Sequence, residues 1–171
     1  MSRSEPRTMS RPVPTIDPTA WVGAAPFAAH LHQLCAASGL PWQVIATFAG
    51  VPLRTAARLV PAGGTAEGNP PRLRRIPRAT ARRLWSVQAD DLHRLRSTWV
   101  EAGPTCARVV RLIATGVPPR QVAAHLDCTL GYLERLVDGL PATVTAEVAV
   151  RARVAAETAD RAFTRRALAA A

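Results

Sequence analysis

The sequence predicts an all-α protein in which one small helical bundle occurs twice, behind a disordered N-terminal arm. Apolar residues recur at the spacing of a single helix face in Phe27, Leu31, Leu34 and Cys35. β-branched residues never alternate with polar residues over more than a few positions, so no segment has the pattern of a strand. The tripeptide Gly39-Leu40-Pro41 returns as Gly116-Val117-Pro118, 77 residues later, which indicates an internal repeat.

Residues 1–19 combine four prolines with three arginines, a composition that cannot bury a core, so we expect a disordered basic arm. Gly39 ends the first helix. A short segment at 42–49 and a helix at 53–60 follow, and a loop rich in Gly, Pro and Arg runs over 61–75. This loop separates the helix at 53–60 from the next predicted helix.

Pro77 stands where that helix begins, because its fixed φ suits the first turn. The segment 143–171 indicates a long alanine-rich helix. We expect the four tryptophans to pack in the core or between helices; they are Trp21, Trp42, Trp85 and Trp99.

The repeat defines two units, 20–99 and 100–171. At the offset of 77, Val44-Ile45-Ala46 meets the segment 121–123, and Arg58-Leu59-Val60 meets the segment 135–137. Ile76 follows Val60 by 16 residues, whereas Val144 follows Val137 by 7. The first unit therefore carries about nine extra residues, which include the arginine-rich loop.

The stretch 42–59 has the pattern of two short helices packed across a tight turn. Its inward positions are Ile45, Ala46, Ala49, Val51, Ala56 and Leu59. Ala46 is small where the helices cross, and Gly50 supplies a left-handed turn residue. The second unit keeps apolar residues at Val122, Ala123, Leu126, Cys128, Leu133 and Leu136. Asp127 replaces the glycine there, and Asp tolerates the left-handed region better than most residues.

On these residues the sequence resembles the helix-turn-helix DNA-binding superfamily. The tandem arrangement resembles regulators from high-GC actinobacteria and their phages. The resemblance implies two tandem helix-turn-helix units and sequence-specific binding of double-stranded DNA, as in a transcriptional regulator or a phage-type repressor. In such motifs the outward residues of the second helix meet base edges in the major groove. We therefore expect the recognition helix at 53–60.

The candidate DNA contacts follow from this placement. The first unit offers Leu53, Arg54, Thr55 and Arg58 toward the bases, and Arg72, Arg74, Arg75 and Arg78 toward phosphates. The second unit offers Thr129, Tyr132 and Arg135. Arg54 and Arg58 suit guanine O6 and N7, and Leu53 suits a thymine methyl.

Charge favours the first unit as the DNA contact. All 22 cationic residues are arginines, and the net charge is +10, which favours an anionic partner, most often nucleic acid. The segment 54–83 holds eight arginines against one acidic residue. In the second unit Glu134 faces outward, where its carboxylate would repel phosphate. The second unit is thus the poorer candidate.

The sequence gives less support to other classes of protein. No apolar run approaches the roughly 20 residues of a membrane span. Three cysteines without a CxxC pair argue against a disulfide framework or a metal site. The chain has no GxxxxGK[ST], GxSxG or HExxH motif, so we expect no enzyme and no cofactor. We expect a cytoplasmic, nucleoid-associated protein with no membrane partner.

One competing hypothesis stays open. It is a protein-interaction module, in which helical repeats act as a scaffold in a complex with RNA polymerase or recombination proteins. A homodimer is a further expected partnership. In this hypothesis the helix-turn-helix shape docks protein instead of DNA.

Overall fold

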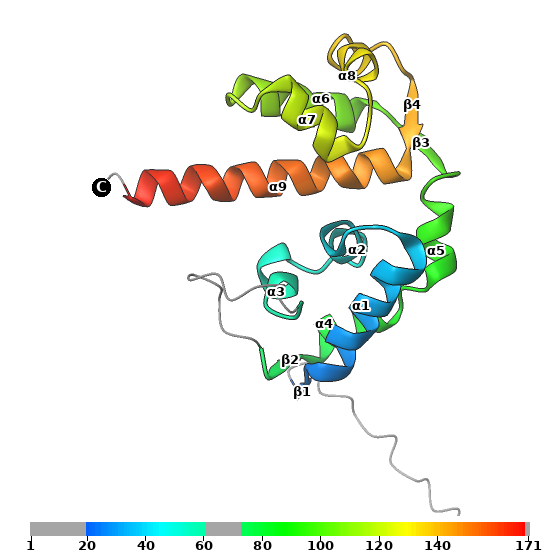
Figure 1. The fold of residues 1–171 in the computed structure, drawn as a ribbon, viewed down its shortest axis with the longest axis vertical. Coiled ribbons are helices and arrows are strands. Elements are labelled where there is room, and N and C mark those ends of the chain that lie inside the picture. The colour runs from blue at the N-terminus through cyan, green and yellow to red at the C-terminus, as the bar shows by residue number, and fades with distance from the viewer. Residues whose placement is uncertain (1–19, 61–72, 170–171) are drawn as a thin grey trace, which may run out of the picture.

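The computed structural model describes residues 20–60 and 73–169 (Figure 1). The predicted arm at 1–19 and most of the arginine-rich loop lie outside the described residues. Within them, nine helices dominate, which confirms a mostly helical fold. The expectation of no strands is wrong, because four strands of three residues each form two antiparallel pairs. Strands this short give no visible alternation in the sequence.

The first unit begins with a strand, three helices and the partner strand. These are β1 (Trp21–Gly23), α1 (Ala25–Ser38), α2 (Trp42–Phe48), α3 (Leu53–Ala57) and β2 (Arg75–Pro77). Two further helices, α4 (Arg78–Trp85) and α5 (Ala89–Arg94), complete it. Val22 lies opposite Ile76 in the β1–β2 pair, so strands at the two ends of the three-helix segment hold it together.

The second unit has the same order of elements as far as its fourth helix. They are β3 (Trp99–Glu101), α6 (Gly103–Ala114), α7 (Pro119–Leu126), α8 (Leu130–Val137), β4 (Thr143–Thr145) and α9 (Ala146–Ala169). Val100 lies opposite Val144, as Val22 lies opposite Ile76. Each residue of α4 therefore corresponds to the residue of α9 that is 68 positions later.

Matching hydrogen bonds support this correspondence. The Arg78 N–H donates to the Ala20 carbonyl, and the Ala146 N–H donates to the Thr98 carbonyl, both at 2.8 Å. The Ala24 N–H donates to the Arg74 carbonyl at 3.0 Å, as the Ala102 N–H does to Ala142. The two halves thus share one backbone plan around different side chains.

Two predicted helices have different bounds in the structure. The helix expected at 53–60 ends at Ala57 as α3, and hydrogen-bonded turns continue the backbone, with Val60 N–H donating to Ala56 O at 3.1 Å. The helix expected at 143–171 begins only at Ala146, because residues 143–145 pair as β4.

Helix α9 belongs to both units. It packs against α6 and α7 of its own unit and against α2 of the first unit (Figure 1). Val150 is 8% exposed and lies in a core cluster with first-unit residues such as Leu31 and Ile45. Burial of this apolar surface joins the two halves into one body.

An ion-pair network lies at the same junction. Glu147, at the start of α9, accepts hydrogen bonds from Arg96 Nε at 3.1 Å and Arg151 Nε at 2.9 Å. Arg96 also donates to the Ser38 carbonyl at the end of α1, at 3.2 Å. The Glu147 side chain is only 11% exposed, so its charge is neutralised by arginines from both sides of the junction.

Candidate nucleic-acid interface

Helices α2 and α3 pack across the turn as their sequence pattern predicts. Ile45, Ala46 and Ala56 are fully buried, and Val51 is buried under the turn. Gly50 has a φ of +67°, and the Val51 N–H donates to the Ala46 carbonyl at 2.8 Å. In the second unit Asp127 has a φ of +56°, and the Cys128 N–H donates to Ala123 at 3.1 Å.

Each turn is also held by an arginine that sequence analysis missed. Arg83 on α4 donates to the Gly50 carbonyl at 3.0 Å. Arg151, the matching residue on α9, donates to the Asp127 carboxylate at 3.1 Å. Alignment of α4 with α9 at the offset of 68 is the signal that would have paired these arginines. The fourth helix of each unit therefore fixes the position of the turn between its second and third helices.

The outward face of α3 carries only part of the predicted contact set. Arg54 is exposed, and Thr55 and Arg58 are half-buried. The prediction that Leu53 faces outward is wrong, because this side chain is 2% exposed and packs in the core of the first unit. Leu53 begins a very short helix and shares a core cluster with Ala46 on α2 and with Ala56 one turn later.

A carboxylate from α9 lies at the start of α3. Glu157 Oε1 accepts a hydrogen bond from the Leu53 N–H at 3.3 Å and one from Arg161 at 2.6 Å. The exposed Asp160 pairs with Arg111 on α6 at 2.7 Å. Sequence reasoning gave Glu157 no role, because 104 residues separate it from Leu53.

Between α3 and α9 lies a groove of about 670 Å³. It is lined by Arg54, Ala57, Arg58, Glu157, Asp160, Arg161 and Thr164. Arg54 and Arg58 thus face Glu157 and Asp160 across it, and Arg161 lies beside these two carboxylates on α9. The α9 side of the groove is acidic, whereas the α3 side is basic.

The arginines predicted to bind phosphate do not all lie together in the structure. Arg72 lies outside the described residues. Arg74 and Arg75 are exposed at the start of β2, and the adjacent Leu73 N–H donates to the Arg58 carbonyl at 3.1 Å. These two arginines therefore lie next to the C-terminal end of α3. Arg78 is instead half-buried on α4 and lines a separate pocket.

The second unit presents its candidates on α8. Thr129 caps this helix by accepting a hydrogen bond from the Tyr132 N–H at 3.2 Å, and Arg135 is exposed. Tyr132 is half-buried, and burial raises the pKa of its hydroxyl. Glu134 is exposed as predicted, so one carboxylate accompanies the single arginine on this helix.

The tryptophans differ from expectation. Trp21, Trp85 and Trp99 are 55%, 59% and 64% exposed, and Trp42 alone is partly buried against the core clusters. Trp21 and Trp99 are matching residues at the outer ends of the two strand pairs. Their indoles therefore lie at the surface in both units.

The chain matches no protein-family model, no curated protein and no solved structure. Among the described residues, no three His, Cys, Asp or Glu side chains lie together as metal ligands would. None of the described helices is both long and apolar enough to cross a bilayer.

Proposed function

We propose that the protein consists of two tandem helix-turn-helix units and binds double-stranded DNA through α3 of the first. The observation that carries this proposal is the α2–α3 pair, with its left-handed Gly50 and with Arg54 on the exposed face. In helix-turn-helix proteins a helix pair joined by a tight turn places its second helix in the major groove. The net charge of +10 supports an anionic partner.

The charges around α3 favour one approach of the duplex. Arg54 and Arg58 lie on the face that would meet base edges, where a guanidinium can bind guanine O6 and N7 together. Arg74 and Arg75, beside the end of α3, would bind the backbone. Glu157 and Asp160, across the groove from Arg54 and Arg58, are already paired with arginines and would not attract phosphate to α9. We infer that the duplex lies toward β2 and away from α9.

Sequence-specific binding of this kind suits a transcriptional regulator or a phage-type repressor. The protein would then act at the nucleoid, in the cytoplasm. The second unit, with Glu134 beside Arg135, would contribute less to the DNA contact and more to the stability of the first unit through α9.

Salt dependence tests the proposal. Binding of a random-sequence fluorescent duplex is measured by anisotropy between about 50 and 300 mM salt. If about six arginines meet phosphates, log K falls with log[salt] at a slope near −5, about −0.9 per contact. Arg74→Ala and Arg75→Ala should each flatten that slope by about one unit. Arg120→Ala, an exposed arginine of the second unit, is the matched control and should not. An affinity independent of salt contradicts the proposal.

A protein-interaction module is the second candidate, and exposed apolar residues favour it. Leu130, Val137 and Leu140 are 41%, 40% and 64% exposed on α8 and the turn that follows. RNA polymerase or a recombination complex would supply the partner. A module of this kind loses its affinity for DNA when competitor DNA is added at moderate salt, whereas a sequence-specific binder keeps it for its own site.

A further inference from the structure

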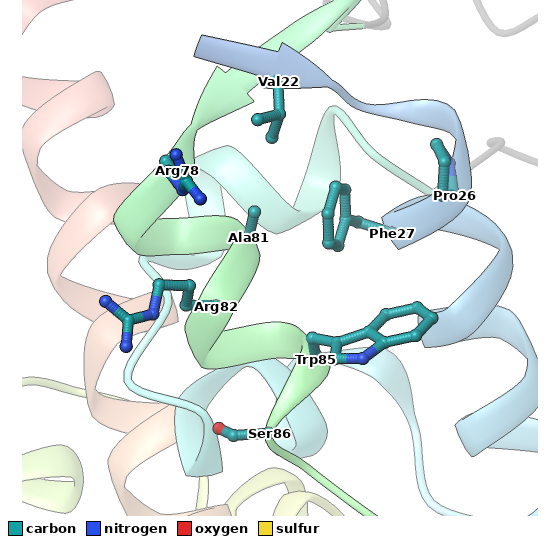
Figure 2. Close-up of a pocket in the computed structure, with 8 residues that line it drawn as sticks. All are labelled: Val22, Pro26, Phe27, Arg78, Ala81, Arg82, Trp85 and Ser86. Atoms are coloured by element: carbon teal, nitrogen blue, oxygen red, sulfur yellow. The ribbon is translucent and has the colours of Figure 1, made fainter. Parts of the chain in front are cut away.

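An apolar pocket of about 510 Å³ lies between β1, α1 and α4, away from the groove beside α3 (Figure 2). Val22, Phe27, Ala81 and Trp85 provide its apolar walls, and Arg78 and Arg82 lie along one side. The Phe27 and Trp85 rings meet edge to face at 6.1 Å. Trp85 is nevertheless 59% exposed, so this aromatic pair leaves a large apolar surface uncovered.

The second unit shows how this fold uses the same face. Val150 on α9 corresponds to Arg82 on α4, and Thr105 corresponds to Phe27. Val150 is buried against the first unit, so there the face is already an interface. In the first unit Arg78 and Arg82 replace Ala146 and Val150, and Phe27 and Trp85 replace Thr105 and Arg153. The α4 face is therefore suited to a partner that is apolar and acidic.

Such a surface exists elsewhere on the same chain, at the end of α8. Leu140 is 64% exposed and Val137 is 40% exposed. Two exposed carboxylates, Glu134 and Asp138, lie beside them in the sequence. Asp138 caps the helix through its backbone N–H, which donates to the Glu134 carbonyl. This turn therefore offers apolar side chains that can cover the apolar walls of the pocket and carboxylates that can pair with its arginines.

We propose that the α8–β4 turn of one copy docks into the α4 pocket of a second copy. Leu140 would cover Phe27 and Trp85, and Asp138 would face Arg82. The pocket and the turn lie toward opposite ends of the long axis (Figure 1). A contact between two different surfaces at opposite ends can repeat from copy to copy into chains or rings, or occur twice in an antiparallel dimer.

A second copy could instead place its α7 on α4, which would repeat between copies the packing of α9 on α2. This arrangement fits less well. Helix α7 corresponds to α2, the helix that α9 covers in the first unit. Arg120 on α7 takes the place of Gln43 and is exposed. Docking α7 on α4 would bring Arg120 toward Arg82, and like charges across an interface are unfavourable.

Sedimentation velocity of the full chain without DNA tests the proposal through a charge exchange. The weight-average sedimentation coefficient of the wild type should rise with protein concentration. Arg82→Glu and Asp138→Arg should each lower the association constant by about tenfold or more, because each places like charges together. An equimolar mixture of the two variants restores opposite charges at every contact and should associate as the wild type does. Arg120→Glu makes the same charge change as Arg82→Glu and should leave association unchanged.

Leu140→Ser tests the apolar half of the contact at a side chain too exposed to be needed for folding. It should weaken association while the far-UV circular dichroism stays the same. A wild type that remains monomeric up to about 1 mM overturns the proposal. So does a mixture that fails to restore association, or an Arg120→Glu variant that weakens it equally. These results do not depend on DNA, so the DNA-binding proposal stands or falls separately.

Discussion

Two residues with positive φ, Gly50 and Asp127, set where the helix pairs turn. A Cβ at Gly50 would meet nothing within 4 Å, so the requirement for glycine is one of backbone conformation alone. A left-handed conformation costs most residues about 1–2 kcal/mol. Asp127 adopts it in the second unit with its carboxylate bonded to Arg151.

We predict that Gly50→Val lowers the free energy of unfolding by about 1–2 kcal/mol, the cost of the left-handed conformation. Gly50→Asp, which copies the second unit, should lower it less, because Asp tolerates this region. Urea unfolding followed by circular dichroism measures both. Equal stability of Gly50→Val and the wild type would show that the turn has been assigned to the wrong residue.

The pKa of the Cys128 thiol gives a prediction about the rate at which this thiol reacts. Burial raises the pKa of Cys128, and the negative charge of Asp127 raises it further. A raised pKa leaves less thiolate at a given pH, so alkylation by iodoacetamide should be slower than for an unperturbed thiol. Asp127→Asn removes the charge and should speed the reaction at Cys128 near pH 8. Mass spectrometry of the Cys128 peptide reports the rate, and a rate unchanged in Asp127→Asn would exclude this charge effect.

The role of a single residue could be predicted where it depends only on the residue's neighbours in the sequence. Gly50, Val51 and Asp127 were assigned correctly because a tight turn constrains its own residues. Arg83 and Arg151 were not, because they bond to turns 33 and 24 residues away in the chain. The orientation of Leu53 was missed for a similar reason, since it depends on the tertiary position of α3.

At the level of elements, α3 contacts the middle of α9. Glu157 accepts the Leu53 N–H and lines the groove with Arg54. Gln at this position would keep an acceptor for that N–H while removing the charge. The sequence predicted both helices but not their contact, because α9 carries only a sparse apolar stripe.

We predict that Glu157→Gln raises the affinity for duplex DNA up to about fivefold, since charge interactions at exposed sites contribute about 0.2–1 kcal/mol. Glu134→Gln makes the same charge change on α8 and is the control; it should have a smaller effect. Fluorescence anisotropy at one salt concentration compares them. An affinity that falls in Glu157→Gln would mean that the carboxylate supports the bound state.

The whole molecule depends on α9, which completes the second core and covers part of the first. The repeat itself was visible in the sequence, through matching Gly-x-Pro segments. The junction was not, because Val150 and Glu147 look like ordinary residues of an alanine-rich helix. Their partners, such as Arg96, lie in the other unit.

This arrangement predicts one cooperative unfolding transition. Glu147→Gln should lower the stability by about 1.5–3 kcal/mol, the usual contribution of hydrogen bonds to a charged group. Glu101→Gln, on an exposed strand residue, should change it little. Circular dichroism and tryptophan fluorescence should give the same urea midpoint for the wild type. Separate midpoints would show that the units unfold independently and that α9 does not couple them.

Recognition of DNA by α3 is tested most directly with a duplex selected by the protein from random sequence. Dissociation constants for this duplex and an unrelated one are compared in wild type, in the Arg54→Ala, Arg58→Ala double variant, and in Arg120→Ala. Each lost guanine contact removes about 1–3 kcal/mol of discrimination. The double variant should therefore bind both duplexes equally weakly, while Arg120→Ala keeps the wild-type preference. A double variant that still prefers the selected duplex would contradict recognition by α3.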